Sequence, residues 1–276
     1  MVEHYYFDDL YKEMLRQVIN YGTKQENKRT GTTVTAFHGM AVKWDMKYYP
    51  LLQLRKMFPK TGAAEVAWML LGTTSTEFLN KYTSIWKQFE DDGMPGNINT
   101  AYGYRWRSAF KVDQIENIVN KLKEDPSSRQ QVLMSWDPRI DNVIPNKNIP
   151  CPYTAVINII GGKLNIHLTL RSNDIVVGLP YDFLMYTLLG NLFANELGVE
   201  PGILAYSIAH GHIYHEHLGT VDKVMNKETD CKRVKVGFTD TITSCRSNPE
   251  LFVSNVAEDC ASYTPCEWNP RPKVIL

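Results

Sequence analysis

Residues 150–197 read PCPYTAVINIIGGKLNIHLTLRSNDIVVGLPYDFLMYTLLGNLFANEL, and they contain the strongest structural signals in the chain. Short β-rich runs come first (TAVINII, KLNIHLTLRS and DIVVG), and turns separate them. Residues 181–197 follow as one apolar segment of helical length. Strands followed by an apolar helix predict a sheet that is covered by helices.

The sequence on either side adds helices and further strands. We expect helices over residues 4–21, 63–72, 75–90 and 113–124, and strands over residues 33–45 and 203–215. Residues 220–262 are more polar and less regular, which favours either a lid or insertion or a set of weakly patterned strands. The whole pattern predicts one α+β domain over residues 1–276. Its large mixed or antiparallel sheet would carry helices mainly on one side.

Composition excludes several classes of protein. The chain has 276 residues, with 30 basic and 30 acidic side chains, so its formal net charge is zero. Proteins that bind polymeric nucleic acid usually carry a basic excess, so we expect no polymeric nucleic acid as a partner. We see neither a membrane span nor the apolar core of a signal peptide, so we expect a soluble, cytoplasmic protein that does not bind membranes. The five cysteines include no CxxC pair, so no zinc site or disulfide framework is expected.

Cys151 is the cysteine whose surroundings best suit chemistry. It lies in NIPCPYT, directly before a β run, and the prolines on both sides restrict the backbone. A constrained backbone suits a thiol that must be aimed at a substrate. A buried cysteine that only packs in the core would show the same local pattern, and the residues alone leave both interpretations open.

The segment that follows the β runs contains a possible anion site. Arg171 and Ser172 could bind an anion through a charge-assisted fork and a hydroxyl. Gly178 and Pro180 form a turn that opens the next helix and places Asp182 near its start. The alternatives are a surface ion pair for Arg171 and a favourable dipole interaction for Asp182.

Residues 210–217, HGHIYHEH, are rich in histidine but lack the HExxH spacing of a zinc helix. On a strand, His210, His212 and Tyr214 share one face. This face could bind a ribose, hold a metal ion or carry no ligand. We expect no metal here.

Taken in order along the chain, eight short motifs resemble those of the thymidylate synthase superfamily. They are RTGT at 29–32, EVAWMLLG at 65–72, IW at 85–86, AYGYRWR at 101–107, SR at 128–129, PC at 150–151, RSNDIVVGLP at 171–180 and HIY at 212–214. Each motif is weak by itself, but eight in the same order are specific. The resemblance implies a thymidylate synthase-like fold whose sheet is used for homodimerisation.

The resemblance also implies roles for individual residues. Cys151 would attack C6 of a pyrimidine nucleoside monophosphate, and the one-carbon donor would be 5,10-methylenetetrahydrofolate. The other catalytic residues would be Glu65, Tyr102 and Asp174. Phosphate would be bound by Arg29, Arg171 and Ser172, with Arg129 donated by the other subunit of the homodimer. The sugar 3′-hydroxyl would be bound by His212 and Tyr214. The folate would contact Trp86, Phe89, Asp174, Gly178, Tyr181 and Leu276, at the C-terminus that closes over the ligands.

These residue types suit the implied chemistry. Thiolate addition at C6 makes C5 nucleophilic, so one hard step is split into easier ones. Arginines near Cys151 would favour its thiolate. Glu65 stands alone in an apolar helix, so we expect desolvation to raise its pKa and allow it to move protons through water.

Departures from the family pattern indicate the base. Thymidylate synthases have asparagine where this chain has Asp182, and the amide pairs with N3 and O4 of uracil. An ionised carboxylate only accepts hydrogen bonds, so it suits the amino group of cytosine instead. Asp182 and the run RSND resemble the deoxycytidylate 5-hydroxymethylases of phages. Pro152 replaces the histidine that usually follows the cysteine in thymidylate synthases, a histidine that the phage hydroxymethylases also lack. Gln130 replaces a second arginine and weakens one phosphate contact.

The expected reaction is therefore the folate-dependent conversion of dCMP to 5-hydroxymethyl-dCMP, a phage DNA precursor. Water added to the C5 methylene gives this product, whereas hydride gives 5-methyl-dCMP, and the exclusion of water decides between them. A thymidylate synthase or dUMP hydroxymethylase is a further alternative, as is a nucleotide-binding relative without turnover. A zinc deaminase would need a PCxxC motif, which Cys151 does not begin.

Overall fold

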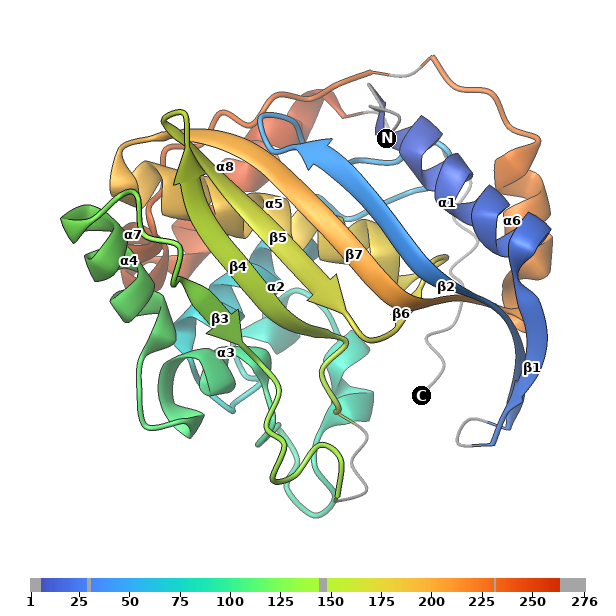
Figure 1. Ribbon diagram of the computed structural model, residues 1–276, viewed down its shortest axis with the longest axis horizontal. Helices are drawn as coiled ribbons and strands as arrows, with labels where there is room; N and C mark the ends of the chain where they lie inside the picture. The colour runs from blue at the N-terminus through green and yellow to red at the C-terminus, as the bar shows by residue number, and fades with distance from the viewer. Residues whose placement is uncertain (1–5, 29–30, 144–147, 231, 264–276) are drawn as a thin grey trace.

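A computed structural model describes residues 6–28, 31–143, 148–230 and 232–263. Its centre is a seven-stranded sheet in the order β1-β2-β7-β5-β4-β3, with β6 paired to β7 (Figure 1). The strands are β1 (Thr23–Asn27), β2 (Thr32–Asp45), β3 (Val132–Met134), β4 (Pro152–Ile160), β5 (Lys163–Leu170), β6 (Asn173–Asp174) and β7 (Glu200–Tyr214). The β5 and β6 strands run parallel to β7, and the remaining pairs are antiparallel. The expected α+β fold with a large mixed sheet is confirmed.

Helices cover one face of this sheet. They are α1 (Phe7–Tyr21), α2 (Pro59–Leu71), α3 (Tyr102–Tyr104), α4 (Gln114–Glu124), α5 (Gly178–Leu197), α6 (Leu218–Met225), α7 (Ile242–Ser247) and α8 (Pro249–Asp259). Figure 1 shows α2, α5 and α8 behind the sheet, while the near face of β4, β5 and β7 carries no helix. The α5 helix is apolar almost all round and buried along most of its length, which identifies it as the central core helix. No helix within the described ranges is long and apolar enough to cross a membrane.

The hairpin of β4 and β5 positions the residues at its open end. Gly161 and Gly162 form the two-residue turn, and their φ angles of 59° and 73° are those that glycine adopts without strain. At the other end, Cys151 precedes β4 and Arg171 follows β5. The Arg171 N–H donates to the Cys151 carbonyl oxygen at 3.0 Å. The strand pairing therefore places these two residues side by side.

The sequence-based predictions of two secondary-structure elements are wrong. Residues 75–90 form only two short 3₁₀ turns, η1 (Leu79–Lys81) and η2 (Ile85–Phe89), instead of a helix. Hydroxyl oxygens of Ser75 and Thr83 accept hydrogen bonds from backbone N–H groups two residues ahead, which competes with helix formation. The run DIVVG is a strand only at its first residue, because the Asp174 side chain accepts the N–H groups of the next residues and turns the chain into α5.

Residues 220–262 contain the end of α6 together with α7 and α8, so the alternative of weakly patterned strands is wrong within the described residues. The α8 helix packs on α2, and α7 packs on both α2 and α5. This segment therefore contributes to the hydrophobic layer behind the sheet. Its interpretation as a lid or insertion stays a prediction.

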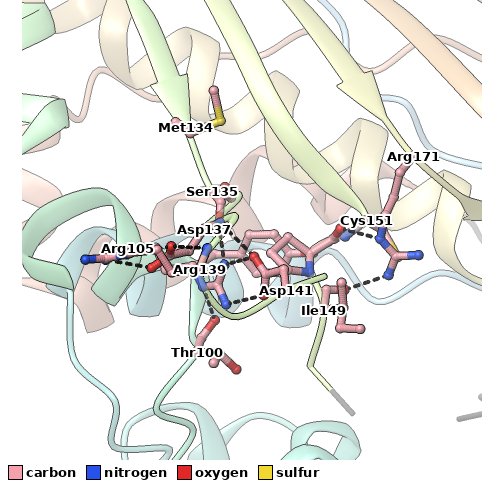
Figure 2. A network of polar contacts seen from close by, with 12 residues as sticks. Thr100, Arg105, Met134, Ser135, Asp137, Arg139, Asp141, Ile149, Cys151 and Arg171 are labelled. Atoms are coloured by element: carbon pink, nitrogen blue, oxygen red, sulfur yellow. Dashed lines mark hydrogen bonds and ion pairs between the residues drawn. The ribbon is translucent and has the colours of Figure 1, made fainter. Parts of the chain in front are cut away.

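A buried ion pair holds the chain that leaves β3 (Figure 2). The Arg105 and Asp141 side chains are 2% and 0% exposed, and Arg105 Nη2 donates to Asp141 Oδ1 at 2.8 Å. Arg105 also donates to the carbonyl oxygens of Thr100 and Ser135. The ion pair thus ties the AYGYRWR segment to the chain that leads toward the cysteine.

We predict that Asp141→Ala destabilises the protein by about 3–5 kcal/mol, because it leaves the Arg105 guanidinium buried without its counter-ion. Glu124→Ala is the control, since Glu124 pairs with Lys121 at the surface and the two side chains are 72% and 45% exposed. We expect a change below about 1 kcal/mol for the control. Urea unfolding followed by circular dichroism measures both. Equal losses in the two variants would contradict the assignment of the buried pair.

Candidate active site

A pocket of about 690 Å³ opens at the end of the β4–β5 hairpin, between the sheet and helices α2 and α5. The structure brings most of the expected site residues to its wall. They are Glu65, Trp86, Phe89, Tyr102, Cys151, Arg171, Ser172, Asp174, Gly178, Tyr181, Asp182, His212 and Tyr214. Arg129 is exposed and does not line the pocket. Arg29 and Leu276 lie outside the described residues.

Cys151 and Arg171 form the positively charged part of the site. Arg171 Nη2 lies 3.7 Å from Cys151 Sγ. The same guanidinium donates to the carbonyl oxygens of Pro150 and Ile149 at 2.8 and 2.9 Å, so its position is fixed (Figure 2). A cation at this distance favours a thiolate over a thiol. Cys151 is only partly buried, so a ligand in the pocket can reach it.

Tyr102 contacts the backbone of the cysteine. Its hydroxyl oxygen accepts a hydrogen bond from the Cys151 N–H at 2.9 Å. Burial raises the pKa of Tyr102, and the nearby Cys151 charge adds to this effect. A neutral phenol therefore lies next to the thiol and can donate its proton in a hydrogen bond.

Asp182 lies where the first turns of α5 meet β6 and β7. Its Oδ2 accepts hydrogen bonds from Asn173 Nδ2 at 2.6 Å and from the Tyr206 hydroxyl at 3.3 Å. Burial raises the pKa of Asp182 to about 7, although these two hydrogen bonds oppose the rise. Asp182 can therefore exist in either charge state near neutral pH.

Glu65 is the second carboxyl group whose pKa lies near neutrality. It projects from the interior of α2 and is 6% exposed. Burial raises its pKa to about 8, a hydrogen bond with Trp86 opposes the rise, and the charge of Asp182 adds to it. The raised pKa expected for an acid in an apolar helix is confirmed. A carboxyl with such a pKa can give or take a proton at physiological pH.

Asp174 differs because its main contacts are with the backbone. Its Oδ1 accepts the N–H groups of Val176 and Val177 at 2.9 and 3.2 Å. Its Oδ2 lies 3.9 Å from His217 Nδ1. Burial raises the pKa of Asp174, and the charge of His217 opposes this. Asp174 thus shapes the loop between β6 and α5 while it lines the pocket.

The histidine-rich strand β7 lines the other side of the pocket. His210, His212 and Tyr214 all reach the wall, as the period of a strand requires. Ser172 Oγ lies 3.5 Å from His212 Nδ1, and the rings of His212 and Tyr214 meet edge to face at 5.0 Å. His215 instead contacts the Thr35 hydroxyl at 3.0 Å. Within the described ranges, no group of three or more His, Cys, Asp or Glu side chains could hold a metal ion.

Arg55 and Tyr186 are among the wall residues that the sequence did not single out. Arg55 is 4% exposed, and its Nη2 donates to the Val176 carbonyl oxygen. A basic residue inside the apolar run LLQLRKMF is the signal that could have identified it. Tyr186 lies one turn after Asp182 on α5, but nothing distinguishes it from the other apolar positions of that helix.

The model of the thymidylate synthase family matches residues 9–250. Because the match covers most of the chain, the protein belongs to this family. Its members are one-carbon transferases of nucleotide biosynthesis that modify C5 of a pyrimidine nucleoside monophosphate. They use 5,10-methylenetetrahydrofolate as the one-carbon donor. This protein is therefore a folate-dependent enzyme that acts on a pyrimidine nucleotide.

The pocket fits a folate next to a nucleotide. Trp86 and Phe89 form an aromatic pair with ring centroids 5.3 Å apart, and Trp86 also lies 5.2 Å from Trp68. Together with Tyr181, this wall offers flat apolar surfaces of the kind on which a pterin ring can stack. The volume of about 690 Å³ is within the usual range for sites that bind small molecules.

We predict that Glu65→Gln stabilises the protein more at pH 8 than at pH 5. In the unfolded chain Glu65 loses its proton near the ordinary pKa of 4.5, but the folded protein keeps it until about pH 8. The folded state therefore binds more protons across this window, and stability falls as pH rises through it. Glutamine removes that loss, so we expect an additional gain of about 2–4 kcal/mol at pH 8.

Thermal unfolding of both proteins at each pH measures this difference. Other buried acids titrate equally in the two proteins, so their effects cancel. Glu77→Gln, at an exposed position, is the control and should show no such pH dependence. A Glu65→Gln gain that is the same at pH 5 and pH 8 would show that Glu65 is not a buried neutral acid.

Proposed function

We propose that the protein is a deoxycytidylate 5-hydroxymethylase that converts dCMP to 5-hydroxymethyl-dCMP. The observation that carries this proposal is the carboxyl group of Asp182 in the wall of the nucleotide pocket. An ionised carboxylate accepts hydrogen bonds and cannot donate one. It attracts the 4-amino group of cytosine and repels O4 of uracil. A site with such a polar contact can discriminate between the two bases by several powers of ten.

Cys151 is the proposed nucleophile. Its thiolate adds to C6 of the cytosine, and the electron pair displaced from the C5–C6 bond makes C5 nucleophilic. The distance of 3.7 Å between Cys151 and Arg171 supports this role, because the guanidinium stabilises the thiolate. Bound 5,10-methylenetetrahydrofolate supplies a carbon at the oxidation level of formaldehyde. After the carbon is bonded to C5, loss of the C5 proton and departure of tetrahydrofolate would leave a methylene group on C5, with Cys151 still bound at C6. Addition of water to this methylene group and release of the Cys151 thiolate from C6 would then restore the aromatic ring.

Glu65 supports the water branch of the reaction. With a pKa of about 8, it can accept a proton from water as that water adds to the methylene group on C5. The product then carries a hydroxymethyl group. Hydride addition at the same carbon would give a methyl group instead, and it requires a site that excludes water.

The remaining roles follow the polar groups around the pocket. Arg171 and Ser172 bind the 5′-phosphate, together with Arg29. His212 and Tyr214 bind the sugar 3′-hydroxyl, and the edge-to-face contact of their rings supports a shared position. Tyr102 holds the backbone of Cys151. Asp174 holds the turn that leads into α5, where Gly178 and Tyr181 line the pocket for the folate.

A homodimer that pairs through the sheet is part of the proposal. On the face of β4, β5 and β7 that lies away from the helices, alternate residues are small or uncharged, such as Val156, Asn158, Thr169, Ala205 and Ser207. Lys163 lies at the hairpin end of this face, but the positions named are uncharged, and such a surface is suited to bury against an identical copy. Arg129 is exposed near this sheet, next to Gln131, whose carbonyl oxygen accepts the N–H of Ile157 in β4. It is therefore available to the phosphate site of a partner.

We predict that the protein adds about 30 mass units to dCMP in the presence of methylenetetrahydrofolate, as expected when CH2O is incorporated. Mass spectrometry of the nucleotide measures this gain. Cys151→Ala should abolish turnover. Asp182→Asn should lower kcat/KM for dCMP by at least about a hundredfold and raise it for dUMP, because the amide pairs with uracil. A gain of about 14 units with dihydrofolate formation would identify a methylase, and turnover of dUMP alone would contradict the base assignment.

We predict that mixing two inactive variants restores activity. Arg129→Ala dimers lack the donated arginine, and Cys151→Ala dimers lack the nucleophile. A heterodimer of the two has one complete site, so random exchange should restore about a quarter of wild-type activity. Refolding an equal mixture and measuring kcat tests this. No recovery, although exchange is verified by a size-tagged subunit, would show that Arg129 does not cross the interface.

A further inference from the structure

We propose that Asn173 is a specificity-determining residue, which holds Asp182 so that one of its oxygens is reserved for the base of the nucleotide. The inference deepens the proposed function and rests on it, because it assumes that Asp182 contacts the base. It concerns the protein's own hydrogen bonds, so it can fail while the proposed function stands.

The buried side chain of Asn173 lies against the carboxyl group of Asp182. It lies in β6, pairs with Gly211 of β7, lines the pocket and is 3% exposed. Its Nδ2 donates to Asp182 Oδ2 at 2.6 Å. Its own Oδ1 is buried and has no donor among the described residues. A buried acceptor without a donor destabilises a protein, and an apolar residue would avoid that cost. The contact with Asp182 is thus what the amide contributes here.

Both protein donors bind the same oxygen of Asp182. Asn173 Nδ2 and the Tyr206 hydroxyl each donate to Oδ2. Tyr206 is itself fixed, because it is fully buried and stacks on Phe183 with ring centroids 4.2 Å apart. No donor from the described part of the chain reaches Oδ1. Asp182 therefore offers the pocket one unoccupied acceptor in a fixed orientation, which matches the donor at C4 of cytosine.

The same two donors act on the charge of Asp182. Burial raises the pKa of Asp182, and the hydrogen bonds from Asn173 and Tyr206 lower it. Without Asn173 the carboxyl would keep its proton to a higher pH. A protonated carboxyl can accept from N3–H of uracil and donate to O4, as an amide does. Loss of Asn173 should therefore weaken the discrimination against uridylate.

Other ionisable groups that interact with Asp182 remain in place when Asn173 is replaced. They are Asp174 from β6, Glu65 from α2, Tyr102 from α3, Tyr186 from α5 and Tyr206 from β7. If the pH dependence of nucleotide binding changes only in the Asn173 variant, the lost hydrogen-bond donor to Asp182 is the cause.

Calorimetric binding of dCMP and dUMP tests the inference without requiring turnover. Wild-type protein, Asn173→Leu and Tyr206→Phe are each titrated with both nucleotides between pH 6 and pH 9. Leucine fills a similar volume but cannot donate to Asp182. Asn191→Leu is the matched control, because Asn191 is 4% exposed, bonds to Met46 and Thr187, and does not line the pocket.

We expect Asn173→Leu to lower the preference for dCMP over dUMP by about tenfold or more, with the midpoint of its pH profile shifted upward. Tyr206→Phe should act in the same direction with a smaller effect, and Asn191→Leu should leave the preference unchanged. If Asn173→Leu does not fold, Tyr206→Phe carries the test, since it removes the other donor to Oδ2. A wild-type preference for dCMP that persists in the folded variants overturns the inference alone. A wild-type preference for dUMP overturns the proposed function with it.

Discussion

The pairing of β4 with β5 brings the two ends of one hairpin together, and the active site is built on that junction. Cys151 directly precedes β4 and Arg171 directly follows β5, and a backbone hydrogen bond of 3.0 Å joins the two residues. Two carbonyl oxygens just before the cysteine hold the guanidinium in place. The positions of the proposed nucleophile and of the arginine beside it are therefore set by main-chain hydrogen bonds. Such main-chain hydrogen bonds fix a residue more firmly than an ion pair between two flexible side chains at the surface does.

Burial of carboxyl groups defines the chemistry of the rest of the pocket. Glu65 and Asp182 come from different helices; burial raises the pKa of both, and the charge of Asp182 raises the pKa of Glu65 further. Their pKa values of about 8 and 7 lie close to the pH of a cell, where small changes in hydrogen bonding alter the charge. The free energy of unfolding is reduced by this arrangement. Two acids that would be more stable in water remain in the wall of the pocket.

Periodicity and short motifs predicted much of this arrangement. The apolar helix ending at residue 197 and the strands around Gly161 were clear because their patterns match their environments. Residues 75–90 were misjudged because hydroxyl side chains, which bond to nearby N–H groups, override an amphipathic pattern. The motifs placed Cys151, Arg171 and Asp182 in one site. They left out Arg55, although a basic residue within an apolar run was a usable signal, and they could not show the contact between Asn173 and Asp182, which depends on how β6 meets the first turns of α5.

The contact at Asp182 has a consequence for how the gene can change. Codons for aspartate and asparagine differ by a single transition at the first base. An amide at this position would turn its oxygen toward the donors of Asn173 and Tyr206, which now bind Oδ2, and its nitrogen toward the ligand. The two neighbours would thus orient either side chain without further change. On the proposed contact between Asp182 and the base, a single mutation would therefore exchange the preferred base of the nucleotide.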